Sequence, residues 1–139
     1  MTQSGNTPEE EKEFLIERIH RGEFSRRDFN MMGDDLRRAD LSNADLTGVN
    51  LRGADLLGAN LEGATLTEVN LSVSNLICAN LSGADLTGAT LVGANLDGVT
   101  LKNATVFNAH FGQNPGMNEN AKAALIKKGA IFEDTPDDS

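Results

Sequence analysis

Residues 79–98 read ANLSGADLTGATLVGANLDG and contain the same five-residue unit four times. Each unit has a leucine at its centre, a polar residue directly before it, and a small residue two positions before it. The central apolar residue recurs every five positions without a break, and a fixed internal period of this kind is a signature of a repeat architecture. The central positions are Leu36, Leu41, Leu46, Leu51, Leu56, Leu61, Leu66, Leu71, Leu76, Leu81, Leu86, Leu91, Leu96, Leu101, Val106 and Phe111.

A period of five fits neither a helix, at 3.6 residues per turn, nor a strand, at two. A helix would spread the leucines around its circumference and bury none of them well. If each unit instead forms one side of a coil, the leucine and the small residue both point inward in every unit. Backbone N–H and C=O groups can then pair between successive coils, as buried backbone requires. The period therefore predicts a solenoid.

The units Ala39-Asp40-Leu41-Ser42-Asn43 and Ala84-Asp85-Leu86-Thr87-Gly88 follow the pattern A(D/N)LxG. Tandem units of this pattern resemble the pentapeptide-repeat family, and the resemblance covers more than half of the chain. It implies an all-β fold, a right-handed quadrilateral β-helix with four units per coil. We therefore expect a solenoid of about four to five coils.

Glycine fills many of the positions two residues after the leucine, including Gly48, Gly53 and Gly58, but Val73 occupies one of them. A positive φ at every such corner would strain the β-branched Val73. We therefore expect glycine to be favoured at the corner without being required there.

The two ends of the repeat need covers, because open strand edges pair with other chains. Thr7-Pro8-Glu9-Glu10 has the pattern of a helical capping box, and Asn118 can begin a second helix. We predict an α-helical cap at each end, with Phe24 and Phe29 beginning the first coil and a two-residue slip of register around Met31. The predicted segments are a disordered 1–7, a capping helix 8–22, the solenoid 23–113, a C-terminal helical cap 114–132 and a disordered 133–139.

Composition restricts the partners that the chain can have. The formal net charge is −9, which argues against direct binding of nucleic acid or of an anionic membrane, since both need a basic surface. The single cysteine, Cys78, cannot form an intrachain disulfide, and the polar residues 1–13 lack the apolar core of a secretory signal. A cytoplasmic protein is expected, and the likeness of residues 125–136 to the tails of small bacterial pentapeptide-repeat proteins suggests a bacterial one.

No catalytic or metal-binding constellation is evident. His20 falls in the predicted N-terminal helix and His110 in the last coil, so the two cannot share a metal. Cys78 lies two coils short of His110, which disfavours a Cys–His nucleophile. We expect no enzymatic activity, no metal and no cofactor.

One stretch departs from the repeat pattern and is the candidate partner-binding surface. Outward positions coincide every fourth unit, which places Arg37, Leu57, Ile77 and Asp97 in one column. Val73 and Cys78 then lie at adjacent corners. An apolar cluster rimmed by charges is typical of a contact site, so the sequence favours a protein–protein interaction or scaffolding module with an unknown protein partner. Drift of the repeat without function is the alternative explanation.

A second hypothesis is a DNA-mimicking modulator of a bacterial type II topoisomerase, since some pentapeptide-repeat proteins imitate DNA. Residues 34–113 carry nine acidic and four basic residues, a net charge of 4 − 9 = −5. A stack about 19 Å tall would need about eleven charges to match B-DNA, so this function ranks second. As assembly states, we expect a monomer or an end-to-end homodimer.

Overall fold

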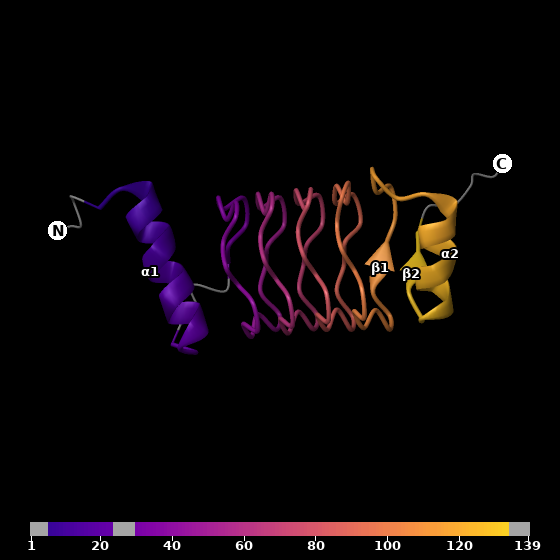
Figure 1. Cartoon of the computed structure of the whole chain (residues 1–139), viewed down its shortest axis with the longest axis horizontal. Helices are drawn as coiled ribbons and strands as arrows, with labels where there is room; N and C mark the ends of the chain where they lie inside the picture. Colours follow the sequence, from indigo (N-terminus) through magenta and orange to yellow (C-terminus); the bar gives the residue numbers. More distant parts are fainter. Residues whose placement is uncertain (1–5, 24–29, 134–139) are drawn as a thin grey trace.

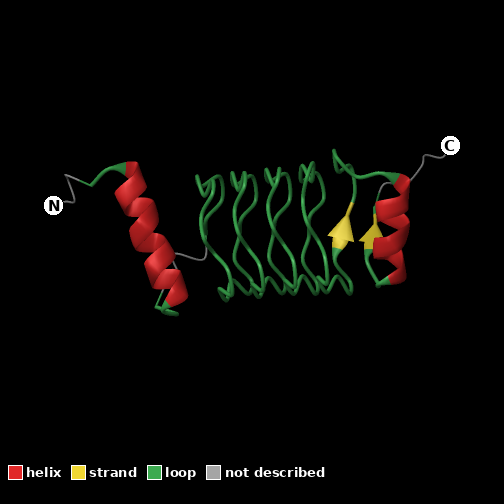
Figure 2. Ribbon diagram, in the orientation of Figure 1, coloured by secondary structure: helices red, strands yellow, loops and turns green. Residues whose placement is uncertain are grey.

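The computed structural model describes residues 6–23 and 30–133. Helix α1 (Pro8–His20) lies at the N-terminal end of a stack of coils, and helix α2 (Glu119–Lys127) lies at the other end (Figure 1). Two short strands, β1 (His110–Phe111) and β2 (Ile131–Phe132), pair in parallel next to α2. The rest of the stack is drawn as loop (Figure 2), because each coil side contributes only one bridging residue.

The coils repeat every twenty residues. Parallel bridges join each polar position to the residue twenty further along, from Asn30↔Asn50 to Thr90↔His110. Each coil contains four turns closed by an i→i+3 hydrogen bond, such as Ala39 N–H to Leu36 O at 3.1 Å. The backbone groups of the coil sides therefore pair with the neighbouring coils, as the repeat predicted.

The interior of the stack is narrow and filled by the central and small residues of the units. Every central leucine from Leu36 to Leu96 is at most 1% exposed, and the small residues from Ala54 to Ala94 are nearly as completely covered. Phe111 closes the core at the C-terminal end and stacks on Phe132 with ring centroids 5.2 Å apart. Burial of this apolar surface is the main favourable contribution to folding.

Glycine is not required at the corners, as predicted, since eight non-glycine residues occupy them, but the reasoning that Val73 would therefore avoid a positive φ is wrong. The residue two after the central position has a positive φ in every turn from Gly33 to Gln113. In the Leu36–Ala39 turn only Arg38 has a positive φ, which together with the i→i+3 hydrogen bond is the pattern of a type II turn. Seven other non-glycine residues share this conformation with Arg38, and among them Val73, at φ 50°, is β-branched.

The polar residue before each leucine has a defined structural task. Every Asp or Asn at this position from Asn30 to Asn95 accepts a hydrogen bond from the backbone N–H two residues later, at 2.9–3.2 Å. That N–H belongs to the second residue of the turn and has no carbonyl of the next coil to bind. Short Asx side chains satisfy it locally, which explains much of the Asp and Asn content of the repeat.

The regular register begins earlier than we predicted. Met31 occupies a central position, is 1% exposed and donates its N–H to Asn50 O at 2.8 Å. Gly33 then follows at the turn position, with φ 74°. There is no slip of register around Met31, because an unbranched methionine fills a leucine position in the core.

Several predictions fall wholly or partly outside the described residues. Phe24 and Phe29, the predicted start of the first coil, lie there, as do most of the segments 1–7 and 133–139. The inner ends of those two segments are nevertheless part of the fold. Thr7 is the N-cap of α1 and forms the predicted capping box with Glu10, and Glu133 donates its N–H to Phe111 O at 2.8 Å.

Replacing Val73 by glycine is expected to stabilise the fold. Val73 is 50% exposed, so little buried surface is lost, whereas a left-handed conformation costs a β-branched residue roughly 1–2 kcal/mol. After the entropic cost of glycine in the unfolded chain, Val73→Gly should raise the free energy of unfolding by about 1 kcal/mol, measured by urea titration. Asn43→Gly is the matched control and should change stability much less, because Asn tolerates this conformation. A Val73→Gly chain less stable than the parent would contradict the inference that the backbone of Val73 is strained.

Acid is expected to weaken the first coil over a defined pH range. Hydrogen bonds from Arg37 lower the pKa of Asp35, and hydrogen bonds from the hydroxyl and N–H of Ser42 lower the pKa of Asp40. A carboxyl group whose pKa is lowered by folding stabilises the folded chain above its unfolded pKa of about 3.9 and loses that effect as the pH falls towards the folded value. The free energy of unfolding should therefore drop below about pH 4, and the double variant Asp35→Asn/Asp40→Asn should show a smaller drop.

Asp34 provides a control, because acid should change its contribution to stability in the opposite direction. It occupies the inward position that alanine fills at Ala54 and Ala94, and burial raises its pKa. Its charged form therefore opposes folding above that pKa, and acid relieves the penalty. Asp34→Ala should stabilise the chain at pH 7 and have a smaller effect at pH 3, as shown by the same urea titrations. Equal stabilisation at both pH values would argue against this account.

Candidate functional site

The predicted column of Arg37, Leu57, Ile77 and Asp97 is a column in the structure. Asp35 pairs with Asp55 and Asp55 with Asn75 across the coils, which places residues twenty apart above one another. The neighbouring turn residues obey the same register, since Gly58 N–H donates to Ile77 O at 2.8 Å. Leu57 and Ile77 are therefore stacked neighbours on one corner of the solenoid. We call the four residues the ridge.

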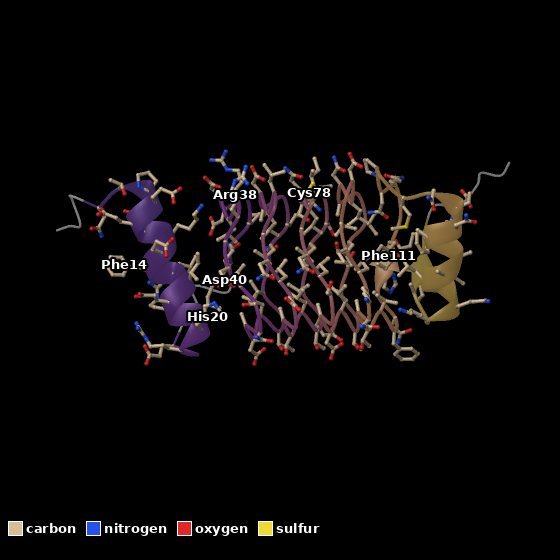
Figure 3. All side chains as sticks on the ribbon, in the orientation of Figure 1. Phe14, His20, Arg38, Asp40, Cys78 and Phe111 are labelled. Carbon is tan, nitrogen blue, oxygen red and sulfur yellow. The ribbon has the colours of Figure 1, made fainter. Side chains whose placement is uncertain are left out.

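The ridge is only moderately exposed at its apolar centre. Leu57 and Ile77 are half-buried, whereas Cys78 at the same corner is exposed. Figure 3 shows Cys78 and Arg38 on the same side of the stack, as their positions forty residues apart require. The apolar centre of the ridge is thus a shallow band with an exposed thiol beside it.

Val73 lies at the next corner and is separated from the ridge by a polar row. That row is the column of bridging residues on the intervening side, in which Asn75 Nδ2 donates to Asp55 Oδ1 at 3.1 Å. The six predicted residues therefore do not form one continuous apolar patch. They form the ridge with Cys78 at one corner and the isolated Val73 at the other.

The charged end of the ridge is firmly organised. Arg37 donates to both carboxylate oxygens of Asp35 at 2.8 Å, and its Nε lies 3.8 Å from Asp55. A bidentate pair of this kind holds the guanidinium in one orientation, and it raises the pKa of Arg37 further above its ordinary value. Arg37 is thus held in one orientation at the N-terminal end of the ridge, with its charge balanced by Asp35.

A groove of about 450 Å³ between α1 and the first coils adjoins this end of the ridge. Ile16, Lys12 and Glu13 of α1 line one side, and Arg37, Arg38 and Leu57 line the other. Sequence reasoning missed Lys12 and Arg38. The repeat register gives the position of Arg38 but cannot say where α1 docks, and the docking of α1 is what makes the groove.

The residues considered for catalysis have other roles or lie apart. His20 Nε2 lies 2.8 Å from Asp40 O, and His110 Nδ1 pairs with Glu133. Within residues 6–23 and 30–133, no group of three or more His, Cys, Asp or Glu side chains could hold a metal ion. In the same part of the chain, no helix has the length and apolar character to cross a membrane.

Comparison with known proteins identifies the repeat. The family model "Pentapeptide repeats (8 copies)" matches residues 35–72, 66–103 and 74–113. A pentapeptide repeat protein from Nostoc Pcc 7120 is 32% identical, with a TM-score of 0.70 over 87% of this chain and 94% of that chain. A pentapeptide repeat protein (Rfr23) from the cyanobacterium Cyanothece 51142 is 33% identical, with a TM-score of 0.56 over 74% of this chain and 65% of that chain.

More distant structures also match. One is QnrB1, a plasmid-mediated fluoroquinolone resistance protein, at 18% identity with a TM-score of 0.35 over 68% of this chain and 62% of that chain. A likeness of this size carries no conclusion about function. No curated protein matches the chain. The repeat register, the dry Leu/Ala core and the two cyanobacterial structures together show that the chain belongs to the pentapeptide-repeat family and has its repeat β-helix fold.

Proposed function

We propose that the chain is a non-catalytic module that binds a partner protein through the ridge. One observation carries the proposal: the ridge is the only corner of the described coils where apolar residues in the second position of the turn stack in consecutive coils. The equivalent columns at the other corners are polar or interrupted. They read Ser42, Glu62, Ser82, Lys102; Thr47, Thr67, Thr87, Phe107; and Met32, Arg52, Ser72, Val92.

The ridge has the composition of a small interface. Leu57 and Ile77 supply apolar area, while the Arg37–Asp35 ion pair lies at one end and Asp97 at the other. Interfaces commonly have an apolar centre with a polar rim, and charges at fixed positions on the rim set orientation more than affinity. The groove beside α1 extends the ridge at its Arg37 end and gives a partner a concave surface to enter.

We also infer that α1 acts as a cap, whereas α2 and β2 cover only part of the C-terminal coil. At the N-terminal end Lys12 Nζ donates to Arg37 O at 3.1 Å, and His20 makes its contact with Asp40 O. Both carbonyls face α1, and no earlier strand among the residues that the structure describes pairs with them. Donors from α1 thus replace a missing coil and protect the edge from pairing with other chains.

The alternative of DNA mimicry gains no specific support. The acidic residues of the coils at Asp35, Asp40, Asp45, Asp55 and Asp85 all accept hydrogen bonds within their own turns. Turn chemistry is therefore sufficient to explain their presence. A supercoiling assay tests the alternative directly: salt-sensitive inhibition or protection of a type II topoisomerase at micromolar protein would favour mimicry over the interaction module.

The single cysteine allows the partner-binding surface to be tested by site-specific cross-linking. Cys78 is exposed beside Ile77, so a benzophenone maleimide attached to it should capture, in native lysate, a protein that docks on the ridge. The captured band should be lost with Ile77→Glu, because a carboxylate cannot be buried against an apolar partner surface without a large desolvation cost. Thr87→Glu places the same charge on the opposite corner of the same coil and should leave the capture unchanged.

A second labelling position controls for non-specific capture. In a chain with both Cys78→Gly and Thr87→Cys, the same probe is attached at residue 87, on the opposite corner of the coil. The proposal requires different proteins at the two positions, and thermal melts should show that Ile77→Glu remains folded. The proposal would be wrong if both positions captured the same proteins, or if the protein captured at Cys78 were still captured with Ile77→Glu.

A further inference from the structure

The coil pattern breaks off on the C-terminal side at Gly116. Leu96 N–H still donates to Pro115 O at 2.9 Å, nineteen residues on, as in the earlier coils. At Gly116 a Cβ would lie only 2.4 Å from Asp97 Cα, so the chain passes this point only as glycine. The chain then leaves for α2 and returns at Gly129, whose carbonyl accepts from Asn108 N–H at 2.9 Å. A helix has therefore replaced the strand sides that would cover residues 97–107 (Figure 1).

The uncovered stretch offers backbone groups in a regular pattern. One coil earlier, the N–H groups of Cys78, Leu81, Gly83 and Leu86 donate to the next coil, and the carbonyls of Ala79 and Ala84 accept from it. Twenty residues later the same groups have no hydrogen-bond partner among the residues that the structure describes. These are the N–H groups of Gly98, Leu101, Asn103 and Val106 and the carbonyls of Val99 and Ala104. We call residues 98–106 the open edge.

An apolar groove of about 330 Å³ runs along the start of this edge. Val99 and Leu101 line it from the coil, and Met117, Ala121 and Ala124 line it from the side of α2. Val99 and Leu101 hold inward positions and are nevertheless half-buried, whereas Ala79 and Leu81, one coil earlier, are 0% exposed. The small alanines of α2 thus leave Val99 and Leu101 partly uncovered, whereas the side chains of Ala104 and Val106, at 5% and 1% exposed, are already covered.

We propose that the open edge is a β-augmentation site, which binds a peptide of a partner protein that runs parallel to residues 99–106 and takes the same corner as the turn from Leu101 to Ala104. These are the groups through which each earlier coil pairs with the next one, so their complement is a chain that follows the coil path. Unpaired edges of this kind are known to add a strand from another chain. The site lies at the end of the stack and does not rest on the function proposed for the ridge.

The coil register defines which peptide fits. Its inward residues should be a small residue and a leucine in a five-residue unit, so that they cover Val99 and Leu101 as the repeat does elsewhere. Its outward residue after the first leucine would stack on Lys102, so an acidic side chain is favoured there, and Lys128 on the groove adds to the positive charge. A second copy of the chain is less suited, because its coil sides are already paired and its first coil lies against α1.

The test uses a peptide copied from the chain itself. Residues 79–88, ANLSGADLTG, cover the edge formed by residues 59–68 in the structure. A blocked, fluorescein-labelled peptide of this sequence should bind the full chain saturably in fluorescence polarisation. N-methylation of the peptide amides that correspond to Asn80 and Asp85 should weaken binding at least tenfold, because these two amides would donate to Val99 O and Ala104 O. Replacing the serine that corresponds to Ser82 with glutamate should strengthen it.

Matched variants of α2 test the location. Ala124→Phe fills the groove and should abolish peptide binding, whereas Ala123→Phe, also exposed on α2 but outside the groove, should not. Thermal melts check that both chains remain folded. Binding that survives both Ala124→Phe and N-methylation, or no binding at millimolar peptide, would overturn the proposal. So would concentration-dependent self-association of the full chain that Ala124→Phe removes, since the occupant would then be a second copy.

Hydrogen exchange gives an independent readout. In the free chain the amides of Leu101 and Asn103 should exchange quickly, while those of Leu61 and Gly63, which occupy the same positions two coils earlier and donate at 2.8 and 2.9 Å, should be protected. Saturating peptide should slow exchange at Leu101 and Asn103 selectively. Protection of these two amides already in the free chain would show that the edge is closed and would also refute the proposal.

Discussion

The fold depends on one backbone conformation that recurs every five residues. A positive φ at the third residue of each turn lets the chain take a corner, and four such corners return it above its own path after twenty residues. The N–H of each central leucine from Leu36 to Leu96 then donates to the carbonyl nineteen residues further along the chain, and its side chain packs against the leucines of the adjoining coils. The hydrogen bonds between coils, the leucine core and the surface columns all follow from that corner.

The same corner explains the polar composition of the chain. The N–H of the second turn residue points away from the ladder, and an Asp or Asn two residues earlier accepts its hydrogen bond. Asp and Asn perform this task equally well by geometry, so the number of aspartates is free to vary without altering the fold. A net charge of −9 is therefore compatible with a core built of leucine and alanine.

The parts of the structure that follow the repeat could be predicted from the sequence, and the others could not. The column of Arg37, Leu57, Ile77 and Asp97 needed only the number of units per coil. Val73 was misjudged because strain at a single residue was treated as prohibitive, whereas its neighbours in the ladder impose the conformation. Met31 was missed because it is not a leucine. The groove at Lys12 and the open edge depend on where non-repeating segments dock, and no periodic signal encodes that.

The twenty-residue coil also limits how the length of such a chain can change. An insertion or deletion of twenty residues adds or removes a whole coil and returns every later residue to its own corner. A change of five residues keeps the core intact, since each unit replaces another, but it turns everything downstream by a quarter of a revolution. Ile77 would then no longer lie above Leu57, although both would remain in a well-formed solenoid. A surface whose residues come from successive coils, such as the ridge, is thus preserved only when the length changes by a multiple of twenty residues. The fold itself tolerates any multiple of five.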